Sequence, residues 1–121
     1  MRVLVVDDHV DGATSMCRLL RVLGHEAHQA NDGVEGLTAA AELHPDVVLL
    51  DIAMPKLNGY EVARRLRAEP WGRHMLLIAV TGWGQDSDKQ RASEAGFDFH
   101  LTKPVDVAEL TRVLASVGVG T

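Results

Sequence analysis

Five polar residues of this chain carry side chains that could together handle a phosphoryl group. They are Asp7, Asp8, Asp51, Thr81 and Lys103. Each follows an apolar run, for example residues 3–6 before Asp7 and residues 47–50 before Asp51, and such runs are typical of buried strands. In an open parallel sheet the C-terminal strand ends converge on one edge, where ligand sites form. We therefore expect these five side chains to meet in one crevice.

The chemistry that suits this set is phosphoryl transfer to a carboxylate. Aspartates within a few ångströms repel one another by on the order of 4 kcal/mol for each close pair near a protein surface. A hard divalent cation such as Mg²⁺ would neutralise that charge and bridge phosphoryl oxygens. Lys103 would supply a second cation and Thr81 a hydroxyl donor. One aspartate could then act as the nucleophile.

The elements that must position these residues follow from the alternation of apolar runs with amphipathic stretches. Strands are predicted at residues 2–6, 27–30, 47–50, 75–80 and 97–101. Helices are predicted at residues 9–23, 33–43, 59–68, 87–95 and 107–117. The first, third and fourth strands are almost wholly apolar, whereas the second and fifth are mixed, as edge strands tend to be. The pattern predicts an α/β fold with a doubly wound, five-stranded parallel sheet in the order 2-1-3-4-5.

Residues at the predicted helix ends agree with these boundaries. Three predicted helices are preceded by an Asx residue with a glutamate three positions later, a pattern typical of helix starts. The pairs are Asp32 with Glu35, Asn58 with Glu61 and Asp106 with Glu109. Gly24 and Gly96 stand where helix C-termini need left-handed backbone.

Composition narrows the function classes. A length of 121 residues favours one domain spanning 1–121. The net charge of −5 argues against a nucleic-acid-binding surface, and the longest apolar run, 75–80, is too short to cross a membrane. The N-terminus enters a predicted strand at once, so we expect no signal peptide. The single cysteine, Cys17, is expected to be buried and fits a cytoplasmic protein.

Several short motifs then carry a resemblance to a known family. The motifs are Asp7-Asp8, Asp51 with the following Met54-Pro55 and Gly59, Thr81-Gly82, and Lys103-Pro104. In this order and spacing the chain resembles the receiver domain of two-component response regulators, over essentially all 121 residues. The segments 81–85 and 96–106 look most like receivers of hybrid sensor histidine kinases.

The resemblance implies a flavodoxin-like fold and a role for each motif residue. Asp51 would be the phosphorylation site. Asp8, Asp51 and the backbone carbonyl of Ala53 would bind Mg²⁺ directly, and Asp7 through water. Thr81 and Lys103 would contact the phosphoryl group. The donor would be a histidine kinase or a histidine phosphotransfer domain, and the chain would catalyse only its own phosphorylation and dephosphorylation.

The same resemblance leads to three further expectations. The Lys103–Pro104 peptide bond is expected to be cis. His100 occupies a position that is usually Tyr or Phe in the family, so a pH-dependent component of switching is expected there. Ala53 and Trp83 would flank the approach of water to the phosphoryl group, which predicts slow hydrolysis with Trp83 as the gate.

The remaining aromatic residues and histidines are given structural roles. Phe97 and Phe99 are predicted to be core residues, and Trp71 a loop residue that packs locally. Besides His100, the histidines are interpreted as surface or turn residues. His9, beside the acidic pair, is the candidate exception.

Two other classes of protein fit parts of the pattern. A Mg²⁺-dependent aspartyl-phosphate phosphatase would use similar carboxylates, but it needs an acid two residues after the nucleophile, where this chain has Ala53. A flavodoxin-like cofactor binder would need a Gly/Ser/Thr-rich loop after the first strand, where this chain has Asp7-Asp8-His9. A steady-state phosphatase assay and the colour of bound flavin would test these alternatives.

Overall fold

Strands and helices alternate along the chain in the computed structural model, which describes residues 1–54, 57–82 and 86–119. The strands are β1 (Arg2–Val6), β2 (Glu26–Ala30), β3 (Val47–Asp51), β4 (Leu76–Thr81) and β5 (Phe99–Thr102). The helices are α1 (Val10–Val22), α2 (Gly33–Leu43), α3 (Gly59–Ala68), α4 (Asp86–Ala95) and α5 (Val107–Val119), with a short 3₁₀ helix η1 (Pro70–Gly72) after α3.

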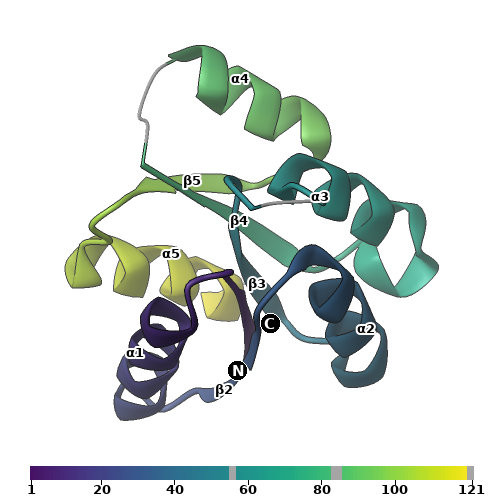
Figure 1. The fold of residues 1–121 in the computed structure, drawn as a ribbon. Coiled ribbons are helices and arrows are strands. Elements are labelled where there is room, and N and C mark those ends of the chain that lie inside the picture. Colours follow the sequence, from purple (N-terminus) through teal and green to yellow (C-terminus); the bar gives the residue numbers. More distant parts are fainter. Residues whose placement is uncertain (55–56, 83–85, 120–121) are drawn as a thin grey trace.

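The five strands form one parallel sheet in the order β2-β1-β3-β4-β5. This order and the placement of β2 and β5 at the edges confirm the prediction. In Figure 1 the sheet runs through the middle of the molecule, with α1 and α5 on one side and α2 and α3 on the other. All crossover helices therefore return the chain to the same end of the sheet, and the strands all point their C-terminal ends at one edge.

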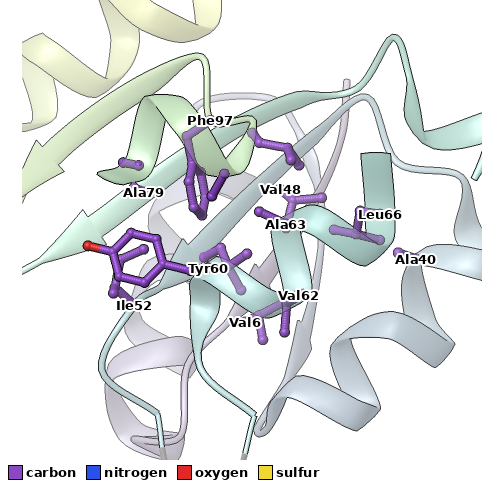
Figure 2. Close-up of a cluster of buried hydrophobic side chains, with 14 of the residues drawn as sticks. Val6, Ala40, Val48, Ile52, Tyr60, Val62, Ala63, Leu66, Ala79 and Phe97 are labelled. Carbon is purple, nitrogen blue, oxygen red and sulfur yellow. The ribbon is translucent and has the colours of Figure 1, made fainter. Parts of the chain in front are cut away.

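Alternate residues of each central strand belong to two separate hydrophobic clusters, one on each face of the sheet. On one face Val6, Val48 and Ala79 pack against α2, α3 and α4, as the buried cluster of Figure 2 shows. On the other face Val5, Leu49 and Val80 belong to a cluster with buried residues of α1 and α5. Because both faces are covered, β1, β3 and β4 are almost wholly apolar, as expected for a parallel sheet.

The predicted caps hold the helix ends. The Asp32 side chain accepts a hydrogen bond from the backbone N–H of Glu35 at 2.7 Å, and Asn58 accepts one from Glu61 at 3.1 Å. Asp106 accepts from the backbone of Ala108 at 2.8 Å at the start of α5. Each cap satisfies backbone donors that the first helical turn leaves without an intrahelical acceptor. Gly24 and Gly96 have φ values of +94° and +106°, as predicted for the helix C-termini.

The largest difference from the sequence-based expectation is at β5, which begins at Phe99 rather than at residue 97. Phe97 is buried in the core as predicted, but the prediction for Phe99 was wrong, since this side chain is 38% exposed. Asp98 separates the two because its carboxylate accepts hydrogen bonds from the Leu77 backbone and from Arg67. These hydrogen bonds hold residues 97 and 98 in the connection before the strand.

Local packing near η1 agrees with the prediction for Trp71. Its ring stacks on His44 with centroids 5.0 Å apart, and it packs at the edge of one core cluster. Cys17 is buried, also as predicted. Within the described ranges, no helix has the length and apolar character needed to cross a membrane.

Candidate functional site

The C-terminal edge of the sheet brings the predicted acidic residues and the lysine together. Asp7 and Asp8 follow β1, Asp51 ends β3, and Lys103 follows β5. An open pocket of about 560 Å³ lies here, and its walls include Asp7, Asp51 and Lys103 together with apolar side chains of the sheet. The crevice expected from the sequence is therefore present for Asp7, Asp51 and Lys103, whereas Asp8 and Thr81 are not among the residues that line it.

Asp51 is held from two sides. Its carboxylate is almost fully buried, and its Oδ1 accepts a hydrogen bond from the backbone N–H of Ala53 at 3.1 Å. Its Oδ2 lies 3.3 Å from the Lys103 ammonium, which is also 3.7 Å from Asp7 Oδ2. Lys103 thus spans two carboxylates that would otherwise repel each other.

The start of α3 approaches the C-terminal end of β3 very closely. The Gly59 backbone N–H donates to the carbonyl of Ile52 at 3.1 Å. A Cβ atom at Gly59 would lie 2.6 Å from the Asp51 carbonyl oxygen, so no other residue fits without a shift. Gly59, which the sequence motif included, therefore sets where the chain turns after Asp51.

Burial dominates the electrostatics of Asp51. Loss of hydration raises the pKa of its carboxyl group above the ordinary aspartate value, and the nearby Asp7 carboxylate raises it further. Lys103 and the Ala53 N–H lower the same pKa but do not outweigh burial. The carboxylate form of Asp51 is therefore costly in the ion-free protein and would be favoured by a further cation.

The donor set fits a hard divalent cation. Oδ1 of Asp8 is shielded from solvent and accepts no hydrogen bond from any residue that the structure describes. This oxygen lies 3.4 Å from Nδ1 of the His9 ring, and a buried carboxylate oxygen that accepts no hydrogen bond is costly, which points to a missing ligand. Candidate ligand atoms of Asp7, Asp8, His9 and Asp51 all lie within 4.8 Å of one another. Carboxylate oxygens at this spacing suit Mg²⁺, with positions left for water and phosphate.

Thr81 and His100 form a pair beside this site. Thr81 ends β4 and is almost fully buried, and its Oγ1 lies 3.0 Å from His100 Nε2 in a hydrogen bond. The Thr81 carbonyl also accepts a hydrogen bond from the Lys103 backbone at 2.7 Å. Thr81 is therefore hydrogen-bonded to His100 through its side chain and to Lys103 through its backbone.

Among the other predicted residues, Ala53 lies next to Asp51 and is exposed, and the Lys103–Pro104 bond is cis. Trp83, the expected gate, lies outside the described residues. His9, the candidate exception among the histidines, lies beside the acidic pair, and its ring approaches both Asp7 and Asp8.

Comparison with known proteins identifies the family. Residues 3–115 match the family described as "Response regulator receiver domain", so the chain belongs to that family. Its members are phosphorylation-switched signalling receivers of two-component systems that accept phosphate from histidine kinases, and this chain is such a receiver.

Three similar proteins illustrate the contexts in which such receivers occur. The DNA-binding dual master transcriptional regulator RpaA of Synechocystis is 36% identical over 115 residues, which are 94% of this chain but only 48% of RpaA. PilH of Pseudomonas aeruginosa is 35% identical and 98% of each chain is covered. The receiver domain of sensor histidine kinase PA1611 from the same organism has a TM-score of 0.88 at 32% identity, with 97% of each chain covered. That receiver was solved with a magnesium ion in its active-site cleft.

Proposed function

We propose that Asp51 is the phosphoryl acceptor of this receiver and that residues 1–121 form a single receiver domain. The observation that carries the first proposal is the position of Lys103, whose ammonium spans Asp51 and Asp7 at the C-terminal edge of the sheet. Asp51 is the most buried of the three aspartates: its side chain is 5% exposed, against 14% for Asp7 and 27% for Asp8. That arrangement fixes one carboxylate for attack on a phosphorus atom.

In the proposed reaction an Asp51 oxygen attacks the phosphorus of a phosphohistidine. An O–P bond forms, the P–N bond breaks, and its electron pair stays on the histidine nitrogen of the donor. The Ala53 N–H and Lys103 orient the Asp51 carboxylate before attack. Lys103 can then pair with a phosphoryl oxygen, and the Thr81 hydroxyl donates to another, as the family resemblance implies.

Mg²⁺ is the proposed cofactor, held by Asp8, Asp51 and the Ala53 carbonyl, with Asp7 acting through water. When bound it would neutralise the carboxylates and stabilise charge on the transferred phosphoryl group. The Asp8 oxygen that accepts no hydrogen bond from the described residues and the magnesium in the similar PA1611 receiver support this proposal.

The proposed partner is a sensor histidine kinase or a histidine phosphotransfer domain. Catalysis by the chain itself would be limited to its own phosphorylation and dephosphorylation, with slow loss of the group in the absence of a partner. The lone buried thiol of Cys17 supports a cytoplasmic location. The match covers 48% of RpaA and 98% of PilH, and the PA1611 receiver is a domain of a sensor histidine kinase. We therefore propose no particular downstream effector for this receiver.

Phosphorylation by acetyl phosphate tests the assignment of Asp51. Intact-mass measurement should show one added phosphoryl group on the wild-type protein with Mg²⁺ and none on Asp51→Asn. Asp46→Asn is the matched control, because Asp46 lies at the opposite end of β3 and accepts a hydrogen bond that asparagine can keep. It should be labelled like the wild type. Equal labelling of Asp51→Asn would contradict the proposal, and steady-state turnover of a phosphate ester would favour the phosphatase alternative.

A further inference from the structure

The His9 side chain approaches the carboxylates that would hold the cation. Its Nδ1 lies 3.4 Å from Asp7 Oδ1 and 3.4 Å from Asp8 Oδ1. The ligand atoms of these three residues and Asp51 lie within 4.8 Å of one another. Atoms that bind one ion from opposite sides at about 2.1 Å are about 4.2 Å apart. Side-chain shifts of a few tenths of an ångström would therefore let His9 Nδ1 reach the same ion as Asp8 and Asp51.

No local structural role accounts for a histidine at position 9. It is the N-cap of α1, where Ser, Thr, Asp or Asn is favoured, yet its side chain makes no capping hydrogen bond in the described structure. Its ring is 76% exposed, so it contributes little to a core. Asp7 instead organises the turn by accepting a hydrogen bond from the His9 backbone at 2.9 Å. This bond holds the base of the His9 side chain beside the two carboxylates.

The imidazole changes which ions the site suits. Carboxylate, carbonyl and water oxygens suit Mg²⁺, whereas an imidazole nitrogen favours ions such as Co²⁺, Ni²⁺ and Zn²⁺. We infer that His9 Nδ1 is a fourth protein ligand, which lets this site bind such transition-metal ions in competition with magnesium. The inference rests on the proposed function, because the same carboxylates hold either ion.

A different explanation of the short distances is that a protonated His9 only pairs with the two carboxylates. The two explanations predict opposite results when the ring is removed. A positive charge opposes every divalent cation, so its loss would strengthen Mg²⁺ and Co²⁺ binding together. A nitrogen ligand contributes chiefly to Co²⁺, so its loss would weaken Co²⁺ binding and leave Mg²⁺ binding nearly unchanged.

Titration calorimetry with Mg²⁺ and with Co²⁺, together with the visible absorption of bound Co²⁺, can decide between them. The proteins are the wild type, His9→Ala, and His74→Ala as a control in an exposed turn outside the cluster. We expect His9→Ala to bind Co²⁺ roughly ten- to a hundredfold more weakly. Losses of metal affinity of this size are seen when a residue that hydrogen-bonds a metal ligand is removed. Its Co²⁺ absorption bands should shift, its Mg²⁺ affinity should stay close to wild type, and His74→Ala should match the wild type in both.

Each other outcome has a definite meaning. Unchanged Co²⁺ affinity in His9→Ala, or equal changes for Co²⁺ and Mg²⁺, would overturn the His9 inference while Mg²⁺-dependent phosphorylation of Asp51 persists. If the wild-type protein bound neither ion and Asp51 were not phosphorylated, the proposed function would fail as well. Asp51 labelling by acetyl phosphate with Mg²⁺, measured on the same samples, therefore separates the two failures.

Discussion

At the scale of single residues, Asp51 is the group whose ionised form is disfavoured by its surroundings in the ion-free protein. Its carboxylate is buried, lies near Asp7, and is only partly compensated by Lys103 and the Ala53 N–H. A group arranged in this way is suited to receive a cation and a phosphoryl group rather than to stabilise the ion-free fold. Buried ionisable groups with strongly perturbed environments cluster at functional sites for this reason.

We expect Asp51→Asn to stabilise the ion-free protein at neutral pH. The pKa of Asp51 is raised on folding above its ordinary value of 3.8, so between the two pKa values the folded state binds more protons. Stability is therefore lost as pH rises through that window, and the cost is complete above the folded pKa. Thermal unfolding without Mg²⁺ should show a higher Tm for Asp51→Asn at pH 7 and a smaller difference near pH 3.8.

Asp46→Asn serves again as the control, since it changes an aspartate at the far end of the same strand. A destabilised Asp51→Asn protein at pH 7, or a difference that grows on acidification, would contradict the burial argument.

A hydrogen bond joins the His100 imidazole to the Thr81 hydroxyl. A neutral imidazole nitrogen can accept or donate, whereas both nitrogens of an imidazolium only donate, so its charge state changes what the Thr81 hydroxyl can do. We expect the rate of phosphorylation by acetyl phosphate to depend on pH near neutrality differently in the wild type and in His100→Tyr. Quenched reactions analysed by intact mass at a series of pH values from about 5.5 to about 8, the range in which an unperturbed histidine titrates, provide the measurement. Superimposable profiles would refute this role of His100.

At the scale of elements, one side chain ties the C-terminal end of α3 to the segments around it. The Arg67 guanidinium donates to the carbonyls of Gly72, Met75 and Gly96 and pairs with Asp98 at 2.7 Å. These contacts join α3, η1 and the turns before β4 and β5. Because Asp98 also accepts from the β4 backbone, Arg67 helps to set where the edge strand begins.

We expect Arg67→Met to lower the free energy of unfolding by about 2–3 kcal/mol, because several partly buried carbonyls and Asp98 lose their donors. Arg64→Met, on the exposed side of the same helix, removes only a 3.5 Å pair with Glu61 and should cost less than about 0.5 kcal/mol. Urea unfolding of the two variants gives the comparison. Equal effects would mean that the Arg67 contacts do not stabilise the fold.

The elements also show what the sequence could predict. Strand order, helix positions and caps follow from local patterns, and the convergence of Asp7, Asp51 and Lys103 follows from the parallel topology. The start of β5 could not be predicted, because it depends on Arg67, which is 31 residues away from Asp98. The Thr81–His100 hydrogen bond joins residues 19 apart on neighbouring strands, and no single-sequence pattern reports such a side-chain contact.

At the scale of the whole molecule, the site joins three parts of the chain that are far apart in sequence. Its acids come from the ends of β1 and β3, and its lysine follows β5. The unfolded chain has no such arrangement, so a cation that binds the folded site stabilises the entire domain. With a net charge of −5, the protein also gains from partial neutralisation of its acidic edge.

We therefore expect Mg²⁺ to raise the Tm in a concentration-dependent way. At a free concentration one hundred times the Kd, the gain should be about 2.7 kcal/mol. Differential scanning calorimetry over a Mg²⁺ series, with NaCl at matched ionic strength, separates specific binding from screening. Asp8→Asn should lose most of the Mg²⁺ effect, because it replaces the carboxylate whose Oδ1 accepts no hydrogen bond from the described residues, whereas Asp46→Asn should keep it. A Tm that responds equally to NaCl and to Mg²⁺, or an Asp8→Asn protein that responds like the wild type, would show that the acidic edge does not hold the ion.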